Sequence, residues 1–289
     1  MRDFVIVTDS SIDMTPEMEK ELGIKVAQLD IVIEGEGGSV PNNEVDIKEV
    51  YSKLRAKKSI STSAVSIGRF TDMFSQILSE GENDILYLGF SSGLSSTYSS
   101  ATVALDDMKE EYPDRKLFAV DTLCASMGQG LLVYLACKKK ESGATIEEVR
   151  DYVEGLKLNL CHWFTVDDLF FLKRGGRVNA ATAVLGTMLA IKPVLHVDNA
   201  GKLINVTKVK GRRASINEMF NKMKATMIPE ENSVAFISHG DCIEDAEYLA
   251  DRIKNELGIE RVEISYVGPV IGSHSGPGTL ALFYIGTER

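Results

Sequence analysis

A hydroxyl-rich turn is the segment of this sequence whose residue types best suit chemistry. An apolar run over residues 85–90 leads into residues 91–100, most of which are serine or threonine, and a helical pattern follows. The first turn of a helix leaves backbone N–H groups unpaired, and the helix dipole places partial positive charge there. Together with hydroxyl donors, this junction predicts a site for a negatively charged oxygen. A serine-rich helix cap that binds nothing is the simpler alternative.

Two further segments carry polar groups that could act with this turn. Residues 59–66 offer more hydroxyls just ahead of a helical pattern, and the glycine-rich residues 268–278 form a predicted loop that carries His274 between two strands. Glycine lets the backbone approach a ligand closely, and histidine can donate a hydrogen bond or exchange a proton near neutral pH. A solvated histidine in an ordinary turn is the alternative for the second segment.

The elements that must position these groups indicate a parallel α/β sheet in the first half of the chain, because short apolar runs alternate there with helical patterns. We expect strands over 4–8, 26–33, 84–90 and 116–121, with helices over 15–22, 46–57, 67–79 and 97–111. Ligands of open α/β sheets bind at the carboxyl ends of the strands, so the polar turns that follow these strands should share one rim.

The second half of the chain predicts an α+β domain. After helices over 126–142 and 145–158, we expect strands over 192–198, 202–208, 233–238, 261–267 and 279–285, with a helix over 243–257. The predicted fold class is therefore α/β with two domains, an N-terminal parallel-sheet sandwich over 1–158 and a C-terminal α+β domain over 159–289.

Composition excludes several classes of function. The net charge of −10 argues against nucleic acid as a partner, because phosphate binding needs a surplus of Lys and Arg. No apolar run reaches the roughly 18 residues of a membrane span, and the N-terminus lacks a signal-peptide pattern. We therefore expect a cytoplasmic protein without stable membrane insertion. The four cysteines have no paired spacing, so no metal is predicted, and the absence of a phosphate loop predicts no ATP site.

A family resemblance rests on five segments taken in order. They are TDSS at 8–11, TSAVS at 62–66, GLSSTY at 93–98, LKRGGR at 172–177 and IGSHSGPG at 271–278. This order resembles the DegV family of bacterial fatty-acid-binding proteins and runs nearly end to end. The resemblance implies a carrier rather than an enzyme, with no cofactor and one long-chain fatty acid in a tunnel between the domains. It also implies a partner, the ATP-binding subunit of a fatty acid kinase, which converts the carboxylate to an acyl phosphate.

The resemblance also implies roles for individual residues. The hydroxyls of Thr62 and Ser95 would hold the carboxylate with His274 nearby, and Ser63 is the neighbouring alternative to Thr62. Ser96 is included in this carboxylate site, although family members usually have glycine at its position. A Cβ is therefore added where the backbone nears the head group.

Two further groups of residues follow from the resemblance or from its implied tunnel. Lys173, Arg174 and Arg177 match the segment that contacts the kinase, while simple stabilisation of a helix C-terminus is the alternative. The candidate tunnel residues are Val184, Leu185, Met188 and Leu189, for which ordinary core positions are the alternative.

A serine acyl hydrolase is the competing hypothesis. Residues 93–97 differ by one residue from the G-x-S-x-G motif of a nucleophile elbow, and Asp121 and His274 follow Ser95 in the chain order of α/β-hydrolases. Thr97 replaces the last glycine of that motif, where the strained turn needs a small residue. The other four segments have no hydrolase explanation, so the carrier is favoured.

Overall fold

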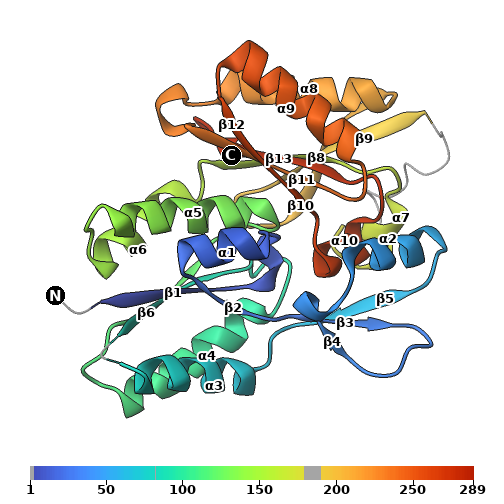
Figure 1. The fold of residues 1–289 in the computed structure, drawn as a ribbon. Coiled ribbons are helices and arrows are strands. Elements are labelled where there is room, and N and C mark those ends of the chain that lie inside the picture. Colours follow the sequence, from blue (N-terminus) through green and yellow to red (C-terminus); the bar gives the residue numbers. More distant parts are fainter. Residues whose placement is uncertain (1–2, 82, 179–189) are drawn as a thin grey trace.

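The computed structural model describes residues 3–81, 83–178 and 190–289, which form three sheets with helices around and between them (Figure 1). The candidate tunnel residues Val184, Leu185, Met188 and Leu189 lie outside the described residues. None of the described helices is both long and apolar enough to span a membrane.

The first sheet is parallel, as predicted, with the strand order β2-β1-β6-β7. Its strands are β1 (Phe4–Asp9), β2 (Lys25–Ala27), β6 (Asp84–Gly89) and β7 (Leu117–Asp121). Alternate strand residues pack toward opposite faces. Leu86 and Leu88 belong to a core with α5 (Met127–Glu141) and α6 (Ile146–Leu156), while Ile85 and Tyr87 pack with α3 (Ile67–Ser79) and α4 (Thr97–Glu111). Helices therefore cover both faces, which confirms the predicted sandwich.

A small antiparallel sheet corrects one sequence prediction. It contains β3 (Asp30–Ile33), β4 (Val40–Pro41) and β5 (Ile60–Ser63), next to α2 (Ile47–Arg55). The single strand expected over 26–33 is wrong, because β2 and β3 belong to different sheets. At the break, the backbone N–H of Leu29 donates to Ser10 Oγ at 2.9 Å instead of to a neighbouring strand. An apolar run does not reveal such a change of sheet.

The third sheet has the order β10-β9-β8-β13-β11-β12, and only the β11–β12 pair is parallel. Its strands are β8 (Leu160–Thr165), β9 (Ile191–Val197), β10 (Leu203–Lys210), β11 (Val234–His239), β12 (Arg261–Tyr266) and β13 (Leu280–Ile285). On β8, Cys161 and Trp163 face a core with α8 (Arg212–Thr226) and α9 (Ile243–Leu257), while Phe164 joins the core around α5. One face of this sheet is thus closed by α8 and α9, and the other faces the first half of the chain.

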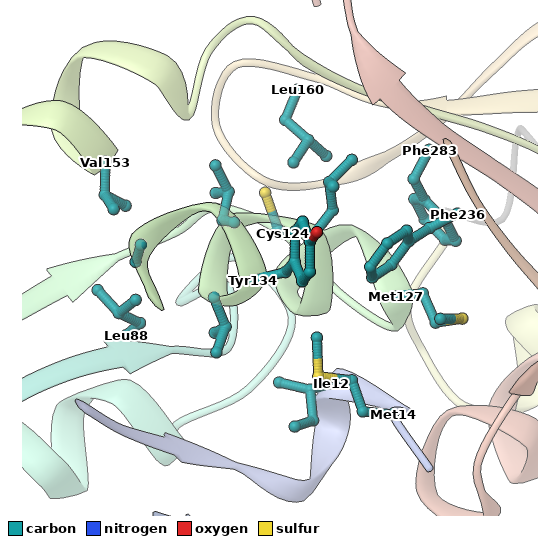
Figure 2. Packing of buried hydrophobic residues seen from close by; sticks show 14 of the residues in the cluster. Ile12, Met14, Leu88, Cys124, Met127, Tyr134, Val153, Leu160, Phe236 and Phe283 are labelled. Atoms are coloured by element: carbon teal, nitrogen blue, oxygen red, sulfur yellow. The ribbon is translucent and has the colours of Figure 1, made fainter. Parts of the chain in front are cut away.

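Helix α5 lies between the parallel sheet and the six-stranded sheet (Figure 1). Figure 2 shows Ile12 and Met14 on one side of this helix and Leu160, Phe236 and Phe283 on the other, all in one hydrophobic core. The rings of Tyr134 and Phe236 lie 5.7 Å apart. Since α6 ends at Leu156 and β8 begins at Leu160, the domain boundary predicted near residue 158 falls in their connection. The division into domains stays a prediction.

The glycine-rich segment 268–278 is not the loop that we expected. It forms helix α10 (Pro269–Ser275), which starts with proline and ends at Gly276. A Cβ at Gly268 would lie 2.4 Å from Asp13 Oδ1, and one at Gly272 would lie 2.6 Å from the Tyr51 hydroxyl oxygen. The glycines therefore allow α10 to pack directly onto the first half of the chain, although glycine disfavours helices and hid this one from sequence analysis.

The remaining short elements connect these parts. They are α1 (Pro16–Leu22), α7 (Phe170–Arg174) and the 3-10 helices η1 (Ser10–Ile12), η2 (Asn42–Glu44) and η3 (Pro229–Glu231).

Candidate functional site

A cavity of about 250 Å³ lies where the three sheets approach one another. One part of its wall, here called the polar end, is formed by Thr62, Ser95, Ser96, Arg177 and His274. Another part, here called the apolar floor, is formed by Phe164, Val197, Ala281 and Phe283 of the six-stranded sheet. Ser96 is exposed, whereas every floor residue is buried. The cavity therefore combines a partly open polar part with an enclosed apolar part.

A hydrogen bond between Thr62 and His274 joins two of the predicted site residues. Thr62 Oγ1 lies 2.8 Å from His274 Nε2, although the residues are 212 positions apart. Thr62 belongs to β5, where successive side chains point to opposite faces. Ser63 is exposed and is not among the described residues that line the cavity. The strand geometry thus separates Thr62 from its neighbour.

The ring of His274 is held against the end of α7. A Cβ at Gly175 would lie 2.3 Å from His274 Nδ1, so the glycine of the 172–177 segment makes room for the imidazole. Burial lowers the pKa of His274 to about 4, and the positive charges of Arg177 and Arg174 act in the same direction. His274 is therefore neutral at pH 7.

The Ser95 side chain hydrogen-bonds to Thr97, the first residue of the helix that follows it. Its Oγ accepts a hydrogen bond from the backbone N–H of Thr97 at 3.2 Å and lies 2.9 Å from Thr97 Oγ1. Ser96 has φ −80° and ψ 0°, an ordinary helical conformation, so its Cβ fits this turn without backbone strain. Ser91 Oγ donates to the carbonyl of Gly201 at 2.8 Å and ties the turn to the β9–β10 hairpin.

The three basic residues near α7 occupy two different environments. Lys173 and Arg174 are exposed, and the Arg174 guanidinium lies 5.2 Å from the centre of the Phe171 ring. Arg177 is half-buried, lines the polar end and donates from Nε to the Leu94 carbonyl at 3.4 Å. Two of the residues predicted to contact a partner therefore face outward, while the third faces the cavity.

The TDSS segment at residues 8–11 is buried and forms hydrogen bonds with residues that line the cavity. Asp9 is fully buried, and its carboxyl accepts hydrogen bonds from the Tyr87 hydroxyl at 2.7 Å and from the Phe90 N–H at 3.0 Å. Burial raises the pKa of Asp9. The neighbouring Ser10 accepts a hydrogen bond from the Leu29 N–H. Both Phe90 and Leu29 line the cavity. This segment positions wall residues and does not itself line the cavity.

The hydrolase residues are not connected as a catalytic triad. Asp121 Oδ1 accepts hydrogen bonds from the backbone N–H groups of Ser92 and Leu123, at 3.2 and 3.0 Å. Within the described parts of the chain, no hydrogen bond links His274 with Ser95 or with Asp121. A nucleophile and its base must lie within hydrogen-bond reach, and here His274 bonds Thr62 instead. The described residues also contain no group of three or more His, Cys, Asp or Glu arranged to hold a metal ion.

Sequence analysis missed the floor of the cavity. Phe164 and Ala281 are directly paired on β8 and β13, as are His162 and Phe283. All four line the cavity. The alternation of side chains within each strand carries part of this signal, but strand pairing decides which residues meet.

Comparisons with known proteins cover nearly the whole chain. The family model described as "Uncharacterised protein, DegV family" matches residues 3–287. A DegV domain-containing protein of Clostridium perfringens is 43% identical over 290 residues, with 100% of this chain and 99% of that protein covered.

Solved structures show the same arrangement. A DegV family protein from Thermus thermophilus, described by its fatty acid binding, is 30% identical with a TM-score of 0.87, covering 99% of this chain and 100% of that one. A Thermotoga maritima protein, described as revealing a fatty acid binding function, is 28% identical with a TM-score of 0.85 and the same coverage.

Proposed function

This chain belongs to the DegV family, and on that premise we propose that it binds one long-chain fatty acid in the cavity between its sheets. The observation that carries the proposal is the Thr62–His274 pair at one end of a cavity whose floor is apolar. A fatty acid has the same division between a polar head group and an apolar chain. The fatty acid binding described for the Thermus thermophilus and Thermotoga maritima relatives supports this proposal.

The carboxylate would lie against Thr62, Ser95 and His274. With hydrogen on Nε2, His274 donates to Thr62, and the Thr62 hydroxyl hydrogen is left for a ligand oxygen. Arg177 lines the same end of the cavity, and its positive charge favours a carboxylate there. A hydrogen bond to a charged group contributes roughly 1.5–3 kcal/mol.

The acyl chain would supply most of the affinity. Each buried methylene contributes about 0.8 kcal/mol, so a chain of about sixteen carbons gains on the order of 10 kcal/mol before ordering costs. The polar end then fixes which end of the ligand faces outward.

We propose further that the protein is a non-catalytic carrier that presents the carboxylate to a separate kinase in the cytoplasm. The polar end includes the exposed Ser96. The exposed Lys173 and Arg174 are the last two residues of α7, and Gly175, which follows them, packs on His274. The kinase would transfer the γ-phosphoryl group of ATP to a carboxylate oxygen, which forms the acyl phosphate and releases ADP. Lys173 and Arg174 would contact that kinase.

The experiment that tests fatty acid binding is denaturing mass spectrometry of an organic extract from the purified protein. A ligand held in an enclosed apolar cavity should survive purification, so we expect a stoichiometric fatty acid. Absence of any fatty acid, together with no thermal shift on addition of palmitate or oleate, would contradict the proposal.

A further inference from the structure

A buried histidine on the cavity wall is not one of the residues assigned above to the carboxylate. His162 lies on β8, is 2% exposed and lines the cavity. Neither of its ring nitrogens makes a well-formed hydrogen bond among the described residues, and only a weak contact with the Leu160 backbone acts on the ring. Its ring packs edge-on against Phe283, with 5.4 Å between centroids. A neutral imidazole carries one donor and one acceptor, and leaving them without well-formed partners in an apolar setting is unfavourable.

Two serine hydroxyls line the same cavity at the start of α5. Ser126 Oγ and Ser238 Oγ lie 3.0 Å apart. Two residues beyond Ser126, Gly128 packs so closely on the histidine that a Cβ there would lie 2.4 Å from His162 Nε2. The imidazole and the two hydroxyls are therefore gathered around one helix end, on α5, β8 and β11 rather than on β5, α7 and α10.

We propose that His162, Ser126 and Ser238 form a second recognition point, for a hydroxyl group carried along the acyl chain, so that the ligands of this protein include hydroxy fatty acids. The inference rests on the proposed function. A hydroxyl both donates and accepts hydrogen bonds, which matches a neutral imidazole and two serines.

The surroundings argue against a second carboxylate at this point. Ser126 also donates to the carboxyl group of Asp13, whose pKa burial raises to about 8. This environment therefore already disfavours negative charge. Arg177 is the cation that lines the described cavity wall, and it belongs to the polar end. The charge of Arg289 acts on His162, but its guanidinium donates to the Leu123 and Lys157 carbonyls and is not among the described lining groups.

The test compares the dissociation constants of stearate and of a series of monohydroxystearates that differ in hydroxyl position. We expect at least one isomer to bind the unaltered protein within about threefold of stearate. In His162→Phe, that isomer should bind about tenfold more weakly than stearate, because its hydroxyl would be buried without a partner. Ser238→Ala is a smaller change, and it should also raise the dissociation constant of that isomer relative to that of stearate. This second variant keeps the test valid if His162→Phe fails to fold.

Ser215→Ala provides a matched control for Ser238→Ala. Ser215 is also a buried serine, but it lies on α8, its hydroxyl donates to the Arg212 carbonyl, and it is not among the described lining residues. This variant should leave the ratio unchanged. The inference is overturned if every isomer is disfavoured equally in the unaltered protein, in His162→Phe and in Ser238→Ala, as expected if these groups bind only water. If stearate itself fails to bind the unaltered protein, the proposed function fails as well, so the two failures are distinguishable.

Discussion

The polar end and the apolar floor of the cavity are assembled in opposite ways. The polar end gathers Thr62, Ser95 and His274 from a strand, a turn and a short helix. The floor is built from neighbouring strands, where Phe164 of β8 is the direct partner of Ala281 of β13. Sheet register fixes the floor, whereas the packing of short segments fixes the polar end. We therefore expect the floor to determine how tightly a ligand binds and the polar end to determine how it is oriented.

The largest effect should come from filling the floor. Ala281 is 6% exposed and faces the cavity, so Ala281→Phe places a ring where the acyl chain would lie. We expect fatty acid affinity to fall by about 100-fold or more, because excluding even four methylenes removes about 3 kcal/mol. Isothermal titration with palmitate measures the change.

The graded variant Ala281→Val controls for overpacking. It should lower affinity less than Ala281→Phe, and urea unfolding should show that both variants fold. Unchanged palmitate affinity in a folded Ala281→Phe protein would mean that the acyl chain does not lie against the floor. The floor would then not determine how tightly the ligand binds.

The second prediction concerns the outer side of the polar end. Arg174→Ala should leave fatty acid affinity unchanged but slow phosphorylation by the cognate kinase about tenfold or more, as expected for loss of a charged interface contact. Arg213→Ala is the matched control, because Arg213 is also exposed and its guanidinium stacks on an aromatic ring, 3.6 Å from the centre of Tyr248. Equal phosphorylation rates in the two variants would refute docking at Arg174.

A third, smaller effect is expected inside the polar end. Ser95→Ala removes one hydroxyl, and loss of one hydrogen bond to a carboxylate weakens binding about tenfold. Ser99→Ala, which changes an exposed serine in the first turns of α4, is the matched control and should bind normally. If Ser95→Ala alone eliminated palmitate binding, the polar end would dominate affinity and our ordering of the two parts would be reversed.

The same contrast explains what could be predicted from the sequence. The helices expected over 67–79, 97–111 and 243–257 match α3, α4 and α9 to the residue, because amphipathic spacing and end residues are local signals. Ser66, for example, caps α3 by accepting from the Arg69 N–H at 3.3 Å. The floor could not be predicted, since the pairing of Phe164 with Ala281 joins strands far apart in the chain.

Residue types alone indicated a site for a negatively charged oxygen at residues 91–100, but the choice of Thr62, Ser95 and His274 as one polar end came from family resemblance and not from periodicity. Thr62 lies on a strand that the sequence pattern did not indicate, and His274 lies on a helix that its glycines concealed. Gly175 shows why such a site is hidden. Its role is to leave space for His274 Nδ1, a contact that neither local segment specifies alone.

The last prediction concerns the pH dependence of stability rather than ligand binding. The pKa of His274 is lowered to about 4 from its ordinary value of 6.5, so between these values the unfolded chain binds a proton that the folded chain does not. The free energy of unfolding should therefore fall as pH decreases from 6.5 to 4 and lose this dependence below 4. His274→Gln should flatten the slope by up to about 1.4 kcal/mol per pH unit, the limit for one proton.

Only the difference between the two proteins reports on His274, because burial also lowers the pKa values of His162, His196 and His239. Urea unfolding at several pH values gives both slopes, and Ala281→Val, a change confined to the floor, should keep the slope of the unaltered protein. Equal slopes with and without His274 would mean that this imidazole titrates as it does in the unfolded chain. The polar end would then be open to water, and it would differ from the floor in composition but not in burial.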